Sequence, residues 1–264
     1  MANAAPLSGG PQAHARILLT LADAGAPGLV TGLALTGSAA LGDWREDLSD
    51  LNFVAVLRRE PRPADLRALA RLHRLYGRVP GRPPLDGVWL DPAALAGGPD
   101  AWSARPVSQG GRFIAESTTA PPPVIWAALT SHGAWLRTPE TLQVWDDPPA
   151  LRRWLKDHLS THWRSWRRRA GGLGPQGLAL LGRAVPAWGV LGASRVWMAL
   201  TRSEIASKTA AGQAARAAFP EHGAILDEAL AHRAGEQPVV ASAWGRRRQA
   251  LACVDSLLDR ATAP

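Results

Sequence analysis

Asp50 and Asn52 lie two residues apart at the start of an apolar segment, 51–57, that is rich in β-branched and aromatic residues. Such a segment predicts a strand. Side chains two residues apart on a strand point to the same face, so Asp50 and Asn52 should project toward one site. Carboxylate and amide oxygens can hold a divalent cation that in turn binds phosphates. The pair is therefore a candidate for metal-dependent chemistry at a phosphate.

A second candidate is the pair Gly37 and Ser38, which follows the apolar segment 29–36. That segment is predicted to be a buried strand that runs into a tight turn. A Gly-Ser turn that opens a helix offers a phosphate backbone N–H groups, a hydroxyl and a favourable helix dipole. Only the polar loop 42–47 and a few residues separate this turn from segment 51–57, so two predicted strands flank one polar loop.

The remaining elements divide the chain into two parts. Apolar periodicity predicts helices over 12–24, 63–76 and 124–132 and a strand over 85–90, whereas 91–123 is rich in Gly, Pro and Ala and should form only short elements. From position 149 the pattern is helical, over 149–169, 174–200, 207–218, 221–232 and 238–261. We therefore expect a small sheet with flanking helices in residues 1–147 and an all-α helical bundle in residues 148–264.

The order of motifs in the first part resembles a known superfamily. A strand, a Gly-Ser pair, a polar loop and then Ser49-Asp50-Leu51-Asn52-Phe53 on the next strand are similar to the nucleotidyltransferase (polymerase-β-like) superfamily. The resemblance implies an α+β fold with a mixed sheet, phosphate binding by Gly37 and Ser38, and metal binding by Asp50 and position 52. It also implies a third acid on the following strand, as a general base or a metal ligand.

Asp86 lies where this third acid would be, in Leu85-Asp86-Gly87-Val88. Because it follows Pro83-Pro84, it is equally interpretable as a turn-forming aspartate without a catalytic role. Strand parity around Gly87 does not decide between the two interpretations.

The C-terminal part resembles a more particular family. Two segments, Gly192-Ala-Ser-Arg195-Val-Trp197 and Ser203-Glu-Ile-Ala-Ser207-Lys208-Thr209-Ala-Ala-Gly212, are similar to the helical domain of aminoglycoside (streptomycin/spectinomycin) adenylyltransferases. In that family an arginine and a lysine at this spacing face the triphosphate across the interdomain cleft, which implies this role for Arg195 and Lys208. The alternative for Lys208 is a solvated lysine at a helix start. Only two of the thirty basic residues are lysines, Lys156 and Lys208.

Two features depart from the family pattern. Asn52 replaces the second aspartate, and an amide brings no negative charge to a metal, so activity could be slow, lost or rescued by loop acids. Those acids are Asp43, Glu46 and Asp47. In addition, residues 181–188 are apolar or basic and the net charge is +8, which disfavours a polycationic drug as the acceptor.

The expected function is transfer of a nucleoside monophosphate from a magnesium-bound nucleoside triphosphate, with ATP the expected substrate, to a hydroxyl of a small, aminoglycoside-like molecule. The alternative, which Asn52 favours, is a catalytically degenerate nucleotide-binding protein of the same fold. Transfer to an RNA end or to a protein side chain is a third possibility that the basic composition permits, although nucleic acid is not the favoured partner.

Composition argues against a membrane-spanning or secreted protein. No run approaches the roughly 18 apolar residues that a membrane span needs, and Met1–Pro6 lacks a basic segment leading into an apolar one, so we expect a cytoplasmic protein. The single cysteine, Cys253, lies in an apolar segment and is expected in the core.

Arginines also cluster away from the motifs. Arg164 and Arg167–Arg169 interleave with Trp163 and Trp166, a pattern that could stack bases and neutralise phosphates. A buried tryptophan face that also includes His162, with the arginines at the end of the helix, is the favoured interpretation. Arg246–Arg248 are similarly interpreted as a solvated face.

Overall fold

The computed structural model describes residues 10–262. The chain divides into two compact units, Met1–Pro148 and Pro149–Pro264. Residues 1–6, on which the expectation about a secretory signal rests, lie outside the described residues. Within the described chain, none of the helices combines the length and the apolar character that crossing a membrane requires.

The N-terminal unit is built on one mixed sheet of six strands in the order β5-β4-β3-β2-β1-β6. β2 and β3 are parallel, and every other neighbouring pair is antiparallel. A parallel pair needs a crossover, and α3 (Pro63–Tyr76) supplies it between β2 and β3. The strands are β1 (Val30–Leu35), β2 (Leu51–Leu57), β3 (Leu85–Leu90), β4 (Arg105–Gln109), β5 (Arg112–Ser117) and β6 (Ala134–Arg137).

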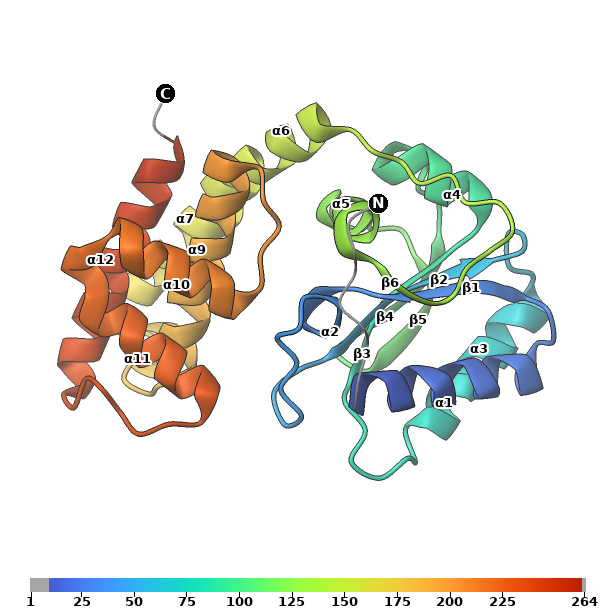
Figure 1. Ribbon diagram of the computed structural model, residues 1–264, viewed down its shortest axis with the longest axis horizontal. Helices are drawn as coiled ribbons and strands as arrows, with labels where there is room; N and C mark the ends of the chain where they lie inside the picture. Colours follow the sequence, from blue (N-terminus) through green and yellow to red (C-terminus); the bar gives the residue numbers. More distant parts are fainter. Residues whose placement is uncertain (1–9, 263–264) are drawn as a thin grey trace. The chain divides into compact units, whose positions relative to one another are not determined.

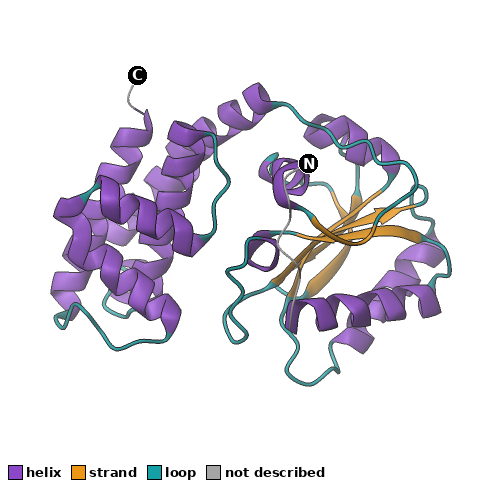
Figure 2. Cartoon of the chain, viewed as in Figure 1, coloured by secondary structure: helices purple, strands orange, loops and turns teal. Residues whose placement is uncertain are grey.

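Helices cover both faces of this sheet (Figures 1 and 2). α1 (Gly10–Gly25) and α3 pack on one face, and α4 (Pro92–Gly97), followed by η1 (Gly98–Ala101), lies with α5 (Val124–His132) on the other. Alternation along β2 divides the core accordingly: Phe53 packs with the α1 and α3 residues, and Val54 packs with Trp126 of α5. The mixed sheet with flanking helices that the sequence predicted is confirmed.

The strands β4 and β5 lie in the segment for which the sequence indicated only short elements. A buried ion pair joins them to the rest of the unit: Arg105 Nε of β4 lies 2.6 Å from Asp91 Oδ2. Asp91 also caps α4, because its other carboxylate oxygen accepts hydrogen bonds from the N–H groups of Ala93 and Ala94. One carboxylate thus fixes both the start of α4 and the neighbouring strand.

Every regular element in the described part of the C-terminal unit is a helix, as the sequence predicted. α9 lies at its centre and packs against α10, α11 and α12. Cys253 lies in its core, fully buried, as expected. The helices are α6 (Pro148–His158), a π-helix, η2 (Leu159–Trp163), α7 (Arg164–Gly171), α8 (Pro175–Ala179), α9 (Ala184–Arg202), α10 (Lys208–Ala218), the short η3 (Pro220–His222), α11 (Gly223–Ala234) and α12 (Ala243–Thr262).

Tryptophan side chains fill much of this core. Trp163 and Trp166 are buried, as the predicted helix face requires, whereas His162 is exposed and its assignment to that face was wrong. A π-helical turn at 159–163 interrupts the α-helical spacing from which that face was predicted. A Cβ at Gly192 of α9 would collide with the Trp163 ring, so this motif glycine permits close packing.

Candidate functional site

The Gly-Ser turn lies directly beside the start of β2. β1 is antiparallel to β2, with Leu35 opposite Phe53, and the Thr36 N–H donates a hydrogen bond of 3.0 Å to the Asn52 carbonyl. α2 (Gly37–Ala40) then begins at the turn itself. Antiparallel pairing therefore brings the end of one predicted strand to the start of the other.

Gly37 is required by the conformation and by the crowding of this turn. Its φ of 60° lies in the left-handed region, which residues other than glycine rarely adopt. A Cβ at this position would collide with Asn52 Oδ1. The Asn52 amide therefore lies against the backbone of the turn, which places a potential metal ligand next to a potential phosphate site.

The helix that follows the turn is shorter than the sequence argument assumed. α2 has four residues, a single turn, so its contribution to an anion through the helix dipole is small. What the turn offers a phosphate is the Ser38 hydroxyl and local backbone N–H groups. Its backbone is braced by a 2.9 Å hydrogen bond from the Asp43 N–H to the Ser38 carbonyl.

Asp86 belongs to a strand, not to a turn. In the parallel pair of β2 and β3, Asp86 lies opposite Asn52, and the Leu51 N–H donates 2.8 Å to the Pro84 carbonyl. Residues in register on neighbouring strands point to the same face, and Asp50 shares the parity of Asn52. The sheet thus places Asp50, Asn52 and Asp86 together, and the turn-forming interpretation of Asp86 was wrong.

The charges of this cluster interact. Burial raises the pKa of the Asp86 carboxyl above its usual value, and the negative charge of Asp50 raises it further. Asp86 is half-buried and Asp50 is exposed, and a divalent cation bound beside two carboxylates that repel each other would relieve that repulsion. The residues therefore fit a magnesium ion, which Asp50 and the Asn52 amide oxygen would hold beside the Asp86 carboxylate.

The acids of the loop between β1 and β2 differ in exposure. Asp43 is buried, with 7% of its surface exposed, whereas Glu46 and Asp47 are exposed. Glu46 accepts a 3.0 Å hydrogen bond from Trp44 Nε1. Among residues 10–262, no group of three or more His, Cys, Asp or Glu side chains is arranged to hold a metal. The Asp50 carboxylate and the Asn52 amide are therefore the protein groups that would hold the metal, and phosphate oxygens would have to complete its ligands.

Gly87 is the residue that the sequence argument did not use. A Cβ at Gly87 would collide with the Phe53 carbonyl oxygen and lie 2.7 and 2.8 Å from two carbons of the Phe53 ring. An isolated glycine inside a strand indicates close backbone approach, and this was the available signal. Gly87 allows β3 to lie close enough to β2 for Asp86 to stand beside Asn52.

In the C-terminal unit, Arg195 and Lys208 are brought together by one loop. Arg195 of α9 is half-buried, and its Nε donates 3.0 Å to the Ala206 carbonyl, two residues before Lys208. The Ser207 hydroxyl caps α10 by accepting a 3.1 Å hydrogen bond from the Ala210 N–H, so Lys208 is the first residue of that helix. Lys208 is half-buried, which does not fit the alternative of a fully solvated lysine.

Comparisons with known proteins show which fold and which family the chain resembles. Residues 182–260 match the C-terminal domain of the aminoglycoside adenylyltransferase family. The whole chain is similar in structure to spectinomycin adenyltransferase AAD(9) from Enterococcus faecialis, which was crystallised with ATP and spectinomycin. That similarity has a TM-score of 0.69 and 11% sequence identity, and it covers 96% of this chain and 99% of the other. No curated protein sequence matches the chain.

The fold is therefore an α+β unit followed by a helical unit, as in that adenyltransferase, and the helical unit matches the C-terminal domain of the aminoglycoside adenylyltransferase family. The chain is thus similar to spectinomycin adenyltransferase in fold and to the aminoglycoside adenylyltransferase family in its C-terminal sequence. The resemblance inferred from the motifs is confirmed.

Proposed function

We propose that the protein is an adenylyltransferase, which moves AMP from magnesium-bound ATP to a hydroxyl of a small molecule. The observation that carries this proposal is the grouping of Asp50, Asn52 and Asp86 beside the Gly37–Ser38 turn. The fold it shares with a protein crystallised with ATP and spectinomycin supports a nucleotide and a small hydroxyl-bearing acceptor as the two substrates. We further propose that it acts in the cytoplasm, where ATP is available.

In this proposal each residue has a distinct role. Ser38 and the backbone of the turn bind phosphate oxygens, and Arg195 and Lys208 neutralise triphosphate charge. Asp50 and Asn52 would hold magnesium, which when bound neutralises phosphate charge and orients the triphosphate. Asp86 accepts the proton of the acceptor hydroxyl, whose oxygen bonds to the α-phosphorus as the bond to pyrophosphate breaks. The raised pKa of Asp86 makes it a better proton acceptor than an exposed carboxylate.

The acceptor is expected to carry less positive charge than a polycationic drug. The chain has a net charge of +8, and like charges disfavour encounter with a polycation. Spectinomycin, the molecule bound by the similar structure, is the first acceptor to assay. Hydroxyl-bearing molecules with little positive charge follow as a panel.

The first test is calorimetric titration of ATP with and without magnesium. We expect magnesium-dependent binding that weakens about tenfold or more in Lys208→Ala, because one charge-assisted contact to phosphate is lost. The matched control is Lys156→Ala, which removes the other lysine from an exposed position of the same unit and should bind ATP as the wild type does. Absence of ATP binding in both metal conditions would refute the assignment.

The second test addresses turnover. Pyrophosphate release with spectinomycin or the acceptor panel should fall at least about a hundredfold in Asp50→Ala, because the principal metal carboxylate is missing. If Asp50→Ala turned over acceptor at the wild-type rate, the proposed site would be wrong even with ATP binding intact.

A catalytically degenerate nucleotide-binding protein is the second candidate, and Asn52 is the observation that favours it. Asn52→Asp restores a second carboxylate opposite Asp86. If the enzyme is active but weakened, we expect tighter magnesium binding and a faster rate in this variant. Magnesium-dependent ATP binding without turnover, in the wild type and in Asn52→Asp alike, would identify the degenerate protein instead.

A further inference from the structure

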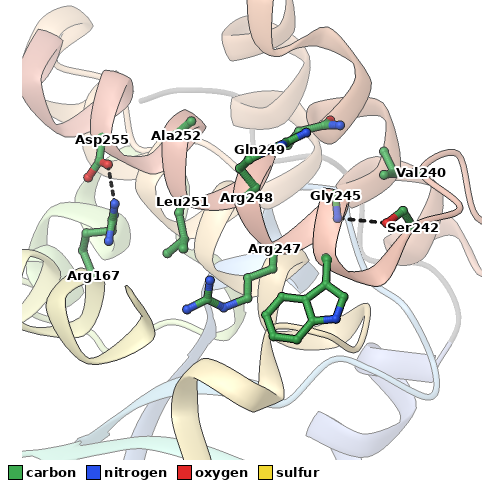
Figure 3. A pocket seen from close by; sticks show the side chains of 11 residues that line it. Arg167, Val240, Ser242, Gly245, Arg247, Arg248, Gln249, Leu251, Ala252 and Asp255 are labelled. Carbon is green, nitrogen blue, oxygen red and sulfur yellow. Dashed lines mark hydrogen bonds and ion pairs between the residues drawn. The ribbon is translucent and has the colours of Figure 1, made fainter. Parts of the chain in front are cut away.

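Two arginine clusters that are far apart in sequence line one pocket of the C-terminal unit. Arg167 of α7 and Arg247 and Arg248 of α12 are among the lining residues, and Figure 3 shows Arg247 and Arg248 on different sides of α12. The pocket has a volume of about 830 Å³, which is ample for a nucleotide-sized ligand. It is formed by α7, α12 and the segment before α12, whereas Arg195 and Lys208 lie on α9 and α10.

Most of these arginines have structural partners, so the interpretation of 246–248 as a solvated face was wrong for two of the three. Arg246 is buried and donates 3.1 Å to the Gly182 carbonyl. Arg247 donates 2.7 Å to the Gly171 carbonyl and 2.9 Å to that of Gly172, at the end of α7. These bonds hold α12 against α7 and thereby fix the pocket wall.

Of the arginines that line the pocket, Arg248 is the exposed one. Arg167 is paired with Asp255 at 2.6 Å, and Figure 3 shows this ion pair at one side of the pocket. Arg248 is exposed and, within residues 10–262, forms no hydrogen bond or ion pair. A guanidinium without a partner at the edge of a pocket is available to an anionic group of a ligand.

An exposed aromatic ring completes the pocket. Trp244 is 57% exposed, and the Arg247 guanidinium lies 5.8 Å from the centroid of its ring. Val240 and Leu251 add an apolar surface to the lining. A ring held next to a fixed guanidinium can stack with a flat ligand at a small cost in side-chain entropy.

The segment that leads into α12 is held in place by a buried carboxylate. Glu228, with 1% of its surface exposed, accepts hydrogen bonds of 2.6 and 3.0 Å from the N–H groups of Val239 and Val240. Arg183 Nε lies 2.6 Å from the other oxygen of this carboxylate. The pocket wall is therefore organised before any ligand arrives.

We propose that this pocket binds a nucleoside phosphate, with the base stacked on Trp244 and the phosphate paired with Arg248. The ligand could be a free nucleotide or one residue of single-stranded RNA. Three exposed arginines, Arg164, Arg168 and Arg169, lie on the helix that carries Arg167 and favour the RNA; of these, Arg164 lies 3.4 Å from the Asp259 carboxylate. Stacking on an aromatic ring combined with nearby cations is the usual means of binding a single strand.

The test uses the full chain and two probes, a fluorescent oligouridylate followed by anisotropy and free UMP followed by calorimetry, without magnesium. Trp244→Ala and Arg248→Gln should each weaken binding about tenfold or more, whereas Trp244→Phe, which keeps a stacking ring, should bind within about threefold of the wild type. Arg153→Gln, an exposed arginine of α6, is the matched charge control and should leave binding unchanged. Circular dichroism of each variant checks the fold.

Two further variants distinguish a free nucleotide from RNA as the ligand, and this pocket from the proposed catalytic site. If Arg168→Gln weakens binding of the oligonucleotide but not of UMP, the ligand is RNA; if it weakens neither, a free nucleotide suffices. Lys208→Ala should not change the binding of either probe, so this inference is tested independently of the proposed catalytic site. The inference is overturned if neither probe binds, if either pocket substitution has no effect, or if Lys208→Ala abolishes binding.

Discussion

At the scale of single residues, the position of Asp86 decides what the candidate site can do. The period of two along a strand was enough to predict that Asp50 and Asn52 share a face. Whether the Asp86 side chain lies on the same face depends on the register of β3 against β2. Register is a property of the paired strands and not of either segment alone. The sequence could therefore propose Asp86 but could not exclude a turn.

The raised pKa of Asp86 has a consequence for stability. Its folded-state pKa lies above the unfolded value, so ionisation costs folding free energy as pH rises through and beyond that interval. Asp86→Asn cannot ionise. In metal-free buffer we therefore expect Asp86→Asn to have a higher Tm than the wild type at pH 7, and the difference should shrink as the pH falls toward 4.

The same substitution should lower turnover about a hundredfold or more if Asp86 is the general base. A variant that is more stable and less active separates a catalytic position from a structural one. An Asp86→Asn protein that is less stable than the wild type at pH 7 would contradict the electrostatic argument, whatever its activity. Thermal unfolding and pyrophosphate release, measured on the same preparations, decide the matter.

At the scale of elements, helices were predicted well where the apolar periodicity was accompanied by residues that favour a helix start or end. The helix over 63–76 has Pro63 at its start, and the Asp65 carboxylate accepts a 2.7 Å hydrogen bond from the Arg62 N–H. β4 and β5 could not be identified because Pro106 and alternating exposed residues leave no continuous apolar run, and their stability comes from pairing and from the Arg105–Asp91 contact.

The packing of β3 on β2 gives a prediction for Gly87. Gly87→Ala should destabilise the protein by roughly 1–3 kcal/mol, because the new methyl group meets the Phe53 backbone, which cannot move without disturbing the sheet. Urea unfolding measures the change. Gly25→Ala is the control, since its Cβ would have no neighbour closer than 4.0 Å, and it should be neutral or slightly stabilising. Equal stabilities for the two variants would mean that β3 can shift away from β2 freely.

At the scale of the whole molecule, the two units have separate hydrophobic cores. The core of the C-terminal unit is built from residues between Leu155 and Ala261, and the two clusters of the N-terminal unit lie between Ala15 and Ala134. The composition shift near position 147 predicted such a division, because a change from mixed to purely helical patterning accompanies a change of core.

Separate cores predict that the fragment 148–264 folds by itself. It should show a helical circular dichroism spectrum and unfold cooperatively. Leu257→Ala, at a fully buried position, should then lower the free energy of unfolding by about 2–5 kcal/mol. A fragment that shows no cooperative transition would mean that the helical unit depends on the rest of the chain.

The burial of Cys253 has a practical consequence for studying motion. Its thiol is fully buried, and burial raises its pKa to about 12, so it should be nearly inert to maleimides and other thiol reagents at neutral pH. Cysteines introduced at exposed positions would then be the reactive thiols. A pair of dyes or spin labels, one on each unit, could then test whether ATP binding changes the distance between the two units, without removal of the native cysteine.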